Sequence, residues 1–510
     1  MTPRTRTRMT VAALALCGAA SLAVAQPAAP ETAPAAEIHA PVVTRHSGVF
    51  NGVSVRYTAT VEETATPGAR LVSTAYTADG ADPAKRPVIF LFNGGPIAPS
   101  DILHMVAFGP RRLAIPADLK ADPAAFRTVD NPYTVLDVAD LVFIDPASTG
   151  FSRVSAGKRP EDYFSVVADG QQVSDFIAGW LRAHGRLASP KYVFGESYGT
   201  IRAAEVADLL AKAPEPVALD GVFLMGQALN IVEFSQRPGN VVSYMVSLPT
   251  LAAIAWYHGK VDKTGMTFPR FLDAARRFAR TNYLDALVQG DQIEPATAGR
   301  VAADLQRFTG VPAAFYLANG LRITKERFRT QLLKDQGLVL GLYDARYTAS
   351  PQSRDNASDA SAAIEPAIHA AFRAYLRADL EVDWSEPYIT ASPVRGLDGW
   401  GWGATTPFSD WPYMDLIGDA MRREPHLRVL MGIGYFDTST TTGATEYALA
   451  QSGWPKDRRG IVYYEGGHMA YTNEAALKKL TSDVRAFVTG PKHTSPGGRG
   501  RGPTAKRLGG

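Results

Sequence analysis

The chain has 510 residues, of which 46% are hydrophobic and 20% charged, so it can bury a large core. Its formal net charge of +3 arises from its two ends, because eight of the 53 basic residues lie in residues 1–25 and 491–510, which contain no acidic residue. Acidic residues therefore slightly outnumber basic ones in the rest of the chain, which gives no support to a nucleic-acid partner. Length alone favours about three domains, although a single α/β enzyme can also be this long.

Residues 1–25 have the pattern of a secretory signal peptide. Three arginines precede an apolar run at 11–22, and Ala23-Val24-Ala25 fits a cleavage site. The run is too short to span a membrane, so we expect cleavage after Ala25 and a secreted or periplasmic protein without a membrane anchor. Cys17 is the only cysteine. A lipid-modified cysteine is the alternative, but Leu16 precedes it where a small residue is usual. The mature chain is expected to contain no disulfide.

The body of the chain is bounded by an Ala/Pro-rich linker at 26–43 and a Gly-rich basic tail at 491–510, whose compositions are typical of disordered segments. Alternating residues predict antiparallel strands at 49–50, 53–61 and 70–77, with Asn51-Gly52 as a turn. Compact apolar runs predict further strands at 88–92, 141–144, 192–194, 221–225, 428–433 and 461–464. Runs this apolar, separated by helical patterns such as that at 173–181, indicate an α/β protein with a mostly parallel central sheet.

Residues 237–395 interrupt this alternation. Apolar spacing around 271–278, 301–308 and 368–376 predicts helices. We interpret the segment as a mainly helical cap, inserted where it could roof an active site. The flanking residues 44–236 and 396–490 are then expected to form the catalytic domain.

The segment Lys191–Thr200 has the pattern of a nucleophile turn. A short apolar strand leads into Gly195-Glu196-Ser197-Tyr198-Gly199, and a helix rich in alanine follows. In a Gly-x-Ser-x-Gly turn the central serine occupies a sharp strand-to-helix corner, and the flanking glycines avoid clashes there. Ser197 is therefore the predicted nucleophile. The alternative is a Gly-rich turn with an idle serine.

A serine hydroxyl becomes a good nucleophile when an imidazole takes its proton and a carboxylate holds that imidazole. His468 follows a predicted strand and a Gly-Gly turn, and Asp437 follows the predicted strand at 428–433. Both would lie at the carboxyl ends of strands, where sites in open α/β sheets are found. Each alone fits an ordinary loop residue. The order Ser197, Asp437, His468 is that of the α/β-hydrolases.

The oxyanion formed during acyl transfer also needs N–H donors. One is expected from the backbone of Tyr198, and a second from a Gly-rich loop after an earlier strand. Asn93-Gly94-Gly95-Pro96 follows the predicted strand at 88–92 and fits that position, although Asn-Gly also makes plain turns.

Four sequence blocks together resemble the serine carboxypeptidase family, and its bacterial members most closely. They are Asn93–Pro96, Asp145–Ser152, Gly195–Gly199 and Gly467-His468-Met469, in family order across roughly 85–475. The resemblance implies an α/β-hydrolase fold and the removal of C-terminal residues from peptides through an acyl-enzyme.

The resemblance also implies residue roles. Gly95 and Tyr198 would supply the oxyanion N–H groups, while Asn93, Gly94 and Glu196 would hold the terminal carboxylate of the substrate. Glu196 would be protonated when it binds that carboxylate, which agrees with the rule that two facing carboxylates share a proton.

The chain departs from the family pattern around that carboxylate site. Ile97 replaces a glycine, and a β-branched residue would be strained there if the position requires a positive φ. Leu91 stands where a tryptophan is common, and Ala107 where a second acidic residue is expected.

These departures leave two alternatives open beside the carboxypeptidase. The same triad would serve an esterase, amidase or acyltransferase, and a catalytically impaired binding homologue is the third reading. Metal and nucleotide motifs are absent from the sequence, so we expect no cofactor and no metal. The expected partner is a peptide substrate.

Overall fold

The computed structural model describes residues 39–351, 359–394, 396–403 and 411–490, all of which belong to one compact unit. The predicted signal peptide, residues 26–38 of the predicted linker and the predicted tail lie outside the described residues. The end of the predicted linker is wrong, because Val42 and Val43 already belong to a strand, Val42–Phe50. The strands, helices and site residues predicted for residues 44–490 lie mainly in the part of the chain that the structure describes.

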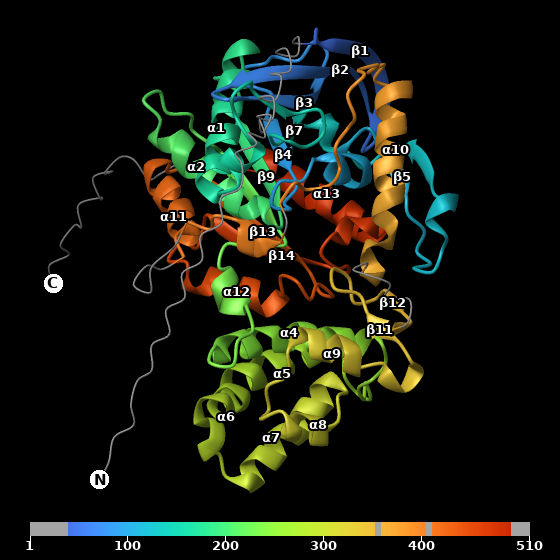
Figure 1. Cartoon of the computed structure of the whole chain (residues 1–510), viewed down its shortest axis with the longest axis vertical. Helices are drawn as coiled ribbons and strands as arrows, with labels where there is room; N and C mark the ends of the chain where they lie inside the picture. Colours follow the sequence, from blue (N-terminus) through green and yellow to red (C-terminus); the bar gives the residue numbers. More distant parts are fainter. Residues whose placement is uncertain (1–38, 352–358, 395, 404–410, 491–510) are drawn as a thin grey trace, which may run out of the picture. The chain divides into compact units, whose positions relative to one another are not determined.

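A ten-stranded sheet crosses this unit (Figure 1). Its strands follow the order β1 (Val42–Phe50), β2 (Val53–Thr66), β3 (Ala69–Ala78), β7 (Asp140–Asp145), β4 (Val88–Phe92), β9 (Lys191–Glu196), β10 (Gly221–Met225), β13 (Arg428–Gly434) and β14 (Arg459–Tyr464), with β8 (Arg153–Val154) beside β3. Pairing is antiparallel from β1 to β7 and parallel from β7 to β14. The predicted class, a mostly parallel sheet with antiparallel strands at its N-terminal side, is confirmed.

Two short hairpins lie outside this sheet. β5 (Arg111–Ala114) pairs with β6 (Arg127–Asp130), and β11 (Val339–Leu340) pairs with β12 (Thr348–Ala349). The turn between β1 and β2 has the predicted form, because Asn51 and Gly52 both have positive φ, of 49° and 81°. Such turns match the twist of the strands that they join.

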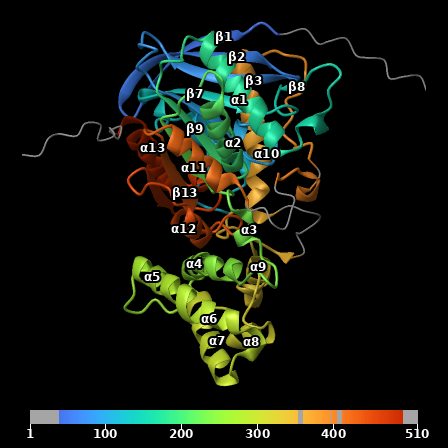
Figure 2. The same cartoon turned by 90° about the vertical axis from the view of Figure 1, so that its left-hand side faces the viewer.

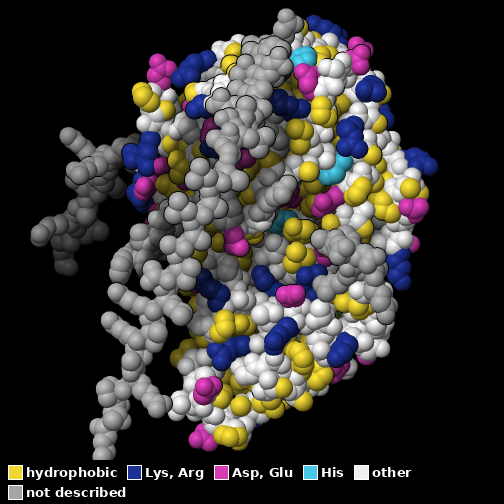
Figure 3. Space-filling model, viewed as in Figure 1, with side chains coloured by type: hydrophobic (Ala, Val, Ile, Leu, Met, Phe, Trp, Pro, Cys, Tyr) yellow, Lys and Arg dark blue, Asp and Glu magenta, His cyan; other side chains and the backbone are white. Residues whose placement is uncertain are grey.

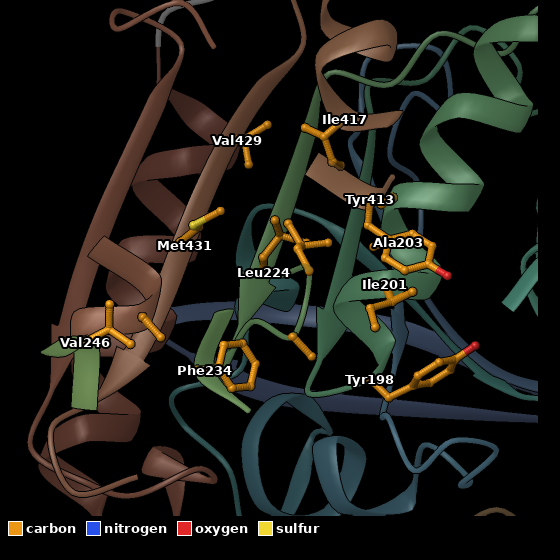
Figure 4. Close-up of a cluster of buried hydrophobic side chains, with 14 of the residues drawn as sticks. Tyr198, Ile201, Ala203, Leu224, Phe234, Val246, Tyr413, Ile417, Val429 and Met431 are labelled. Atoms are coloured by element: carbon orange, nitrogen blue, oxygen red, sulfur yellow. The ribbon is translucent and has the colours of Figure 1, made fainter. Parts of the chain in front are cut away.

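Helices cover both faces of the sheet because its strands are apolar on both sides. On one face Leu224 of β10 and Val429 of β13 pack toward Ile201 of α2 (Gly199–Lys212) and Ile417 of α11 (Tyr413–Arg423), as Figure 4 shows. α1 (Val166–Ala183) lies on the same face, beside α2. Phe223 belongs to the core of the opposite face, since neighbouring strand residues point to opposite sides. That face is covered by α10 (Glu365–Ala378) and α13 (Glu474–Thr489).

Seven helices separate β10 from β11. They are α3 (Ile231–Phe234), α4 (Val241–Tyr257), α5 (Phe268–Phe278), α6 (Leu284–Gln289), α7 (Pro295–Thr309), α8 (Ala313–Ala318) and α9 (Lys325–Gln331). α4 to α8 group together away from the strands (Figure 2). α4 packs on α12 (Thr442–Gln451), where the Thr442 N–H donates to the Thr250 hydroxyl at 2.9 Å. α10, which lies later in the predicted cap, instead packs on the sheet.

None of the described helices combines the length and the apolar character that a membrane span needs. Figure 3 shows acidic and basic side chains intermingled on the face of the molecule that it displays.

Candidate active site

Ser197 occupies the corner between β9 and α2. β9 ends at Glu196 and α2 begins at Gly199, so two residues make the turn. Ser197 has a φ of 58°, in the left-handed region that non-glycine residues rarely adopt. A side chain at Gly195 would overlap the Gly199 carbonyl, which explains the first glycine of the motif. Strained serines of this kind present their hydroxyl at the end of a strand.

His468 and Asp437 form a buried pair at the ends of β14 and β13. The His468 Nδ1 lies 2.6 Å from the Asp437 Oδ2. Asp437 is fully buried, and its oxygens also accept hydrogen bonds from Ser439 N at 2.7 Å, Thr440 N at 3.1 Å and Thr440 Oγ1 at 2.6 Å. These bonds fix the carboxylate and, through it, the imidazole ring.

Ser197 and His468 both lie next to the end of β10. The Ser197 N–H donates to the Met225 carbonyl at 2.9 Å, and a Cβ built on the next residue, Gly226, would lie 2.9 Å from the His468 Cε1. The His468 Nε2 is buried and has no hydrogen-bond partner among the described residues. The structure therefore pairs the predicted acid and base, and it places the predicted nucleophile at the same end of β10. Among the described residues, no hydrogen bond joins Ser197 to His468.

The charges of this pair shift both pKa values. Burial lowers the pKa of His468, but the Asp437 carboxylate, together with the charges of Glu196 and Glu365, outweighs burial and raises that pKa above its usual value. Burial raises the pKa of Asp437, yet its ion pair and its hydrogen bonds outweigh burial and hold that pKa below its usual value. An ionised Asp437 fixes the tautomer with the proton on Nδ1, so that Nε2 can accept a proton.

The loop after β4 lies directly over the nucleophile. A Cβ on Gly94 would lie 2.8 Å from the Ser197 Cβ and 2.7 Å from the Tyr198 nitrogen. Gly95 is exposed and has a φ of 116°. No acceptor among the described residues receives a hydrogen bond from the N–H of Gly95 or of Tyr198. Both predicted oxyanion donors are thus available beside Ser197.

Ile97, in the same loop, has a φ of 51° and a fully buried side chain. The position that the sequence marked as unusual does have a left-handed backbone, which a β-branched residue adopts at a cost. Its side chain joins the core on the α2 side of the sheet.

Glu196 is buried and both of its carboxylate oxygens are already bonded. Asn93 Nδ2 donates to one oxygen, and Tyr471 OH donates to the other at 2.7 Å. Burial raises the pKa of Glu196 to about 7, although these two donors and the charge of His468 act in the opposite direction. The structure therefore brings Asn93 and Glu196 together, but as partners of each other.

The residue that completes this group, Tyr471, did not stand out in the sequence. Tyr471 lies three positions after His468, in the short helical turn Ala470–Thr472, and its hydroxyl donates to Glu196. The family pattern instead predicts a second acidic residue as the partner, at position 107. Ala107 itself is fully buried in a π-helical segment, Leu103–Phe108. Tyr471 carries no motif, and only its position next to the Gly-His-Met block could have drawn attention to it.

A buried ion pair lies next to the turn that contains Ser197. Arg202 of α2 donates to Asp169 of α1 at 2.7 Å and to the Asn93 carbonyl, also at 2.7 Å. Both charged side chains are completely buried. The pair thus joins the helix that follows Ser197 to the loop that lies over it.

The segment 342–346, which follows β11, holds the acid and base loops together. Leu342 O accepts hydrogen bonds from the Thr438 N–H and hydroxyl at 3.3 and 2.5 Å, and Tyr343 O accepts from His468 N at 2.6 Å. Asp344 Oδ2 accepts from Gly467 N at 3.0 Å. No sequence pattern predicts these contacts, because most of their atoms belong to the backbone.

A cavity of about 550 Å³ opens on Ser197. Gly95, Pro96 and Tyr198 line it on the sheet side, and Lys325 and Arg329 of α9 line it on the side of the helical insertion. Tyr343 and Thr440, which contact the His468 ring, also line it. The cavity is large enough for a substrate of a few residues.

Comparison with solved structures returns weak overall similarity. Proline iminopeptidase from Mycobacterium smegmatis shares 14% identity, with a TM-score of 0.37, over 84% of this chain and 97% of that chain. A haloalkane dehalogenase variant from Bradyrhizobium elkanii shares 12% identity at a TM-score of 0.33, over 84% and 96%. A soluble variant of monoglyceride lipase from Saccharomyces cerevisiae shares 10% at 0.35, over 84% and 93%. No curated protein sequence matches the chain.

A family model, described as serine carboxypeptidase, matches residues 73–264. This segment contains Ser197, Glu196 and the whole Asn93–Pro96 loop. The predicted nucleophile, Ser197, follows β9, which pairs in parallel with β4 and β10 in the middle of the sheet. The match confirms the predicted resemblance and supports a serine-type carboxypeptidase hydrolase with the α/β-hydrolase fold.

Proposed function

We propose that the chain is an exported serine carboxypeptidase that removes C-terminal residues from peptides through an acyl-enzyme. The observation that carries the proposal is the buried pair of His468 and Asp437, 2.6 Å apart, in which Nε2 has no hydrogen-bond partner among the described residues. The pair lies next to Gly226, and the strained turn of Ser197 bonds to the preceding residue, Met225. Export rests on the predicted signal peptide alone.

In the proposed reaction the Ser197 hydroxyl attacks the last peptide carbonyl while His468 Nε2 takes its proton. Asp437 stabilises the imidazolium that forms. The N–H groups of Gly95 and Tyr198 donate to the oxyanion. His468 then returns the proton to the leaving amine, the C-terminal residue departs, and water attacks the acyl-serine with His468 again as base.

We place the terminal carboxylate of the substrate at Asn93, Gly94 and Glu196, beside the oxyanion loop. Burial raises the pKa of Glu196 to about 7, so at acidic pH it is protonated and can donate a hydrogen bond to a carboxylate. Each oxygen of Glu196 accepts one hydrogen bond, from Asn93 or from Tyr471, and the added O–H can donate while these bonds remain.

The burial of Glu196 and its bonds within the protein favour a second candidate function. Because both oxygens of Glu196 are occupied, the group is also satisfied as a structural unit. The same triad would then act on esters or amides without a free terminal carboxylate, or transfer the acyl group to an acceptor other than water.

The test uses the mature chain, Ser197→Ala and His468→Ala with a fluorophosphonate probe and with N-blocked dipeptides. We expect labelling of the wild type but not of Ser197→Ala, and a loss of at least ~10³-fold in peptide hydrolysis for His468→Ala. Released C-terminal amino acid is the readout.

Three outcomes contradict parts of this proposal. Absence of labelling in the wild type would support the binding homologue. A near-wild-type rate for His468→Ala would mean that another residue is the base. Equal cleavage of free-acid and C-terminally amidated peptides would favour the second candidate function.

A further inference from the structure

The wall of the active-site cavity that faces Ser197 is formed by α9 of the helical insertion and carries a lysine. Lys325, the first residue of α9, lines the same cavity as Ser197, Gly95 and Tyr198. The proposed mechanism does not use it. A basic side chain in a partly enclosed cavity favours anionic groups on the ligand.

Lys325 has no acidic partner within ion-pair distance among the described residues. Its ammonium group donates to the Ser439 carbonyl at 3.1 Å and lies 5.5 Å from the centre of the Phe234 ring. An ammonium group has three N–H donors, so donors remain after this single hydrogen bond. Burial lowers the pKa of Lys325 to about 8, against the opposing effect of Asp437.

The other charges around the cavity do not compete for this group. Arg329, one turn further along α9, donates to the Asp359 carboxylate at 3.1 Å and to the Leu340 carbonyl at 3.0 Å. Glu326 lines the cavity but is exposed to solvent. Asp437 is fully occupied by His468 and by the hydrogen bonds of the 437–440 loop. Lys325 is thus the cavity cation whose charge is left for a ligand.

We propose that Lys325 binds a carboxylate of the substrate, so that the enzyme prefers acidic substrates. The inference rests on the proposed function in placing the substrate in this cavity. The carboxylate is either the terminal one of the leaving residue or that of an acidic side chain. If the terminal carboxylate binds at Asn93, Gly94 and Glu196, as proposed above, the group at Lys325 is an acidic side chain. If Glu196 instead remains a structural unit with Asn93 and Tyr471, Lys325 is the site for the terminal carboxylate.

The competing role for Lys325 is to position the acid loop through Ser439. A lysine that only holds this loop affects every substrate alike, whereas a carboxylate ligand changes the preference between charged and neutral substrates. The informative quantity is therefore the ratio of kcat/KM values for matched substrates, compared among the wild type, Lys325→Met and Lys325→Arg.

The substrates are N-blocked dipeptides with Glu or Gln before the scissile bond, each with a free or amidated C-terminus, and two p-nitrophenyl esters, one of glutarate and one of butyrate. For Lys325→Met we expect the preference for the carboxylate-bearing member to fall roughly 10- to 100-fold, mainly through KM. Lys325→Arg should retain most of the preference. Lys334→Met, at an exposed lysine of the same insertion, is the matched control.

If the ratio of free acid to amide falls in Lys325→Met relative to the wild type, Lys325 binds the terminal carboxylate. If the ratio of Glu to Gln substrate falls instead, Lys325 binds the carboxylate of the side chain. An unchanged ratio for every pair would overturn the inference, including the case where all rates fall together. If no peptide is cleaved, the proposed function fails, but the glutarate to butyrate ratio still decides whether Lys325 binds a carboxylate.

Discussion

At the scale of single residues, the group formed by Asn93, Glu196 and Tyr471 decides how the site treats a carboxylate. Burial is the largest influence on Glu196 and raises its pKa to about 7, while Tyr471 and Asn93 stabilise the charged form. The balance between these influences sets the pH at which Glu196 changes from hydrogen-bond donor to acceptor.

Tyr471→Phe tests this balance. Removing the hydroxyl removes a donor to the Glu196 carboxylate, so the pKa of Glu196 should rise further, by roughly one unit for one charge-assisted hydrogen bond. The protonated form binds a substrate carboxylate, so the free-acid preference of the wild type should fall as the pH rises through about 7. In Tyr471→Phe that fall should occur at higher pH.

The measurement is the ratio of kcat/KM for a free-acid dipeptide to that for its amide, from pH 5 to pH 9 in each variant. The ratio cancels the titration of His468, which both substrates share. Tyr464→Phe, a tyrosine whose hydroxyl contacts Asp483 instead, serves as control. A shift of the fall toward lower pH would show that Tyr471 does not stabilise ionised Glu196.

At the scale of elements, the loop between β4 and the π-helical segment Leu103–Phe108 combines a strained backbone with a buried side chain. Ile97 has a φ of 51° and is fully buried. A left-handed conformation costs an L-residue roughly 1–2 kcal/mol, whereas removing a large aliphatic side chain from a core costs about 2–5 kcal/mol. Burial therefore outweighs strain, which explains why isoleucine is tolerated here.

Ile97→Gly and Ile97→Ala separate the two effects. Both variants lose the buried side chain, so we expect both to have a lower free energy of unfolding than the wild type. Only glycine relieves the backbone strain, so Ile97→Gly should be more stable than Ile97→Ala by about 1 kcal/mol. Urea unfolding of the two variants measures the difference. At an unstrained site alanine is the more stable of the two, and that order at position 97 would contradict the left-handed conformation.

At the scale of the whole molecule, the sequence predicted the parts of the site that depend on local pattern. Ser197 was predictable because strand, glycines and helix adjoin it in the chain, and the strands that lead to Asp437 and His468 are compact apolar runs. The roles of Tyr471, Lys325 and the segment 342–346 were not predictable in this way. Each acts through contacts with residues far away in the chain, such as Tyr471 with Glu196, 275 positions apart. Such pairs leave no periodicity in a single sequence.

The segment 342–346 connects the helical insertion to the loops of the proposed acid and base. It bonds to the acid loop through Leu342 and Ala345, whose N–H donates to Phe436 O at 3.0 Å, and to the base loop through Tyr343 and Asp344. Asp344 is itself held by a buried ion pair with Arg346, at 2.6 Å. The positions of Asp437 and His468 therefore depend on a segment that precedes both by more than 90 residues.

Asp344→Ala tests this dependence, because it removes the acceptor of Gly467 N and leaves Arg346 buried without its ion-pair partner. Breaking one side of a buried pair costs about 3–5 kcal/mol, and displacement of the base loop should lower kcat by at least ~10-fold. Asp335→Ala, which removes an exposed ion pair with Lys260 in the same insertion, should cost about 1 kcal/mol or less. Unfolding curves measure the loss of stability, and ester hydrolysis measures the loss of kcat.

If Asp344→Ala does not fold, Asp344→Asn is the second variant. It retains an acceptor for Gly467 N but loses the charge that pairs with Arg346, so we expect kcat near that of the wild type and a lower free energy of unfolding. A folded Asp344→Ala with wild-type kcat would show that the loop of His468 holds its position without the Asp344 side chain.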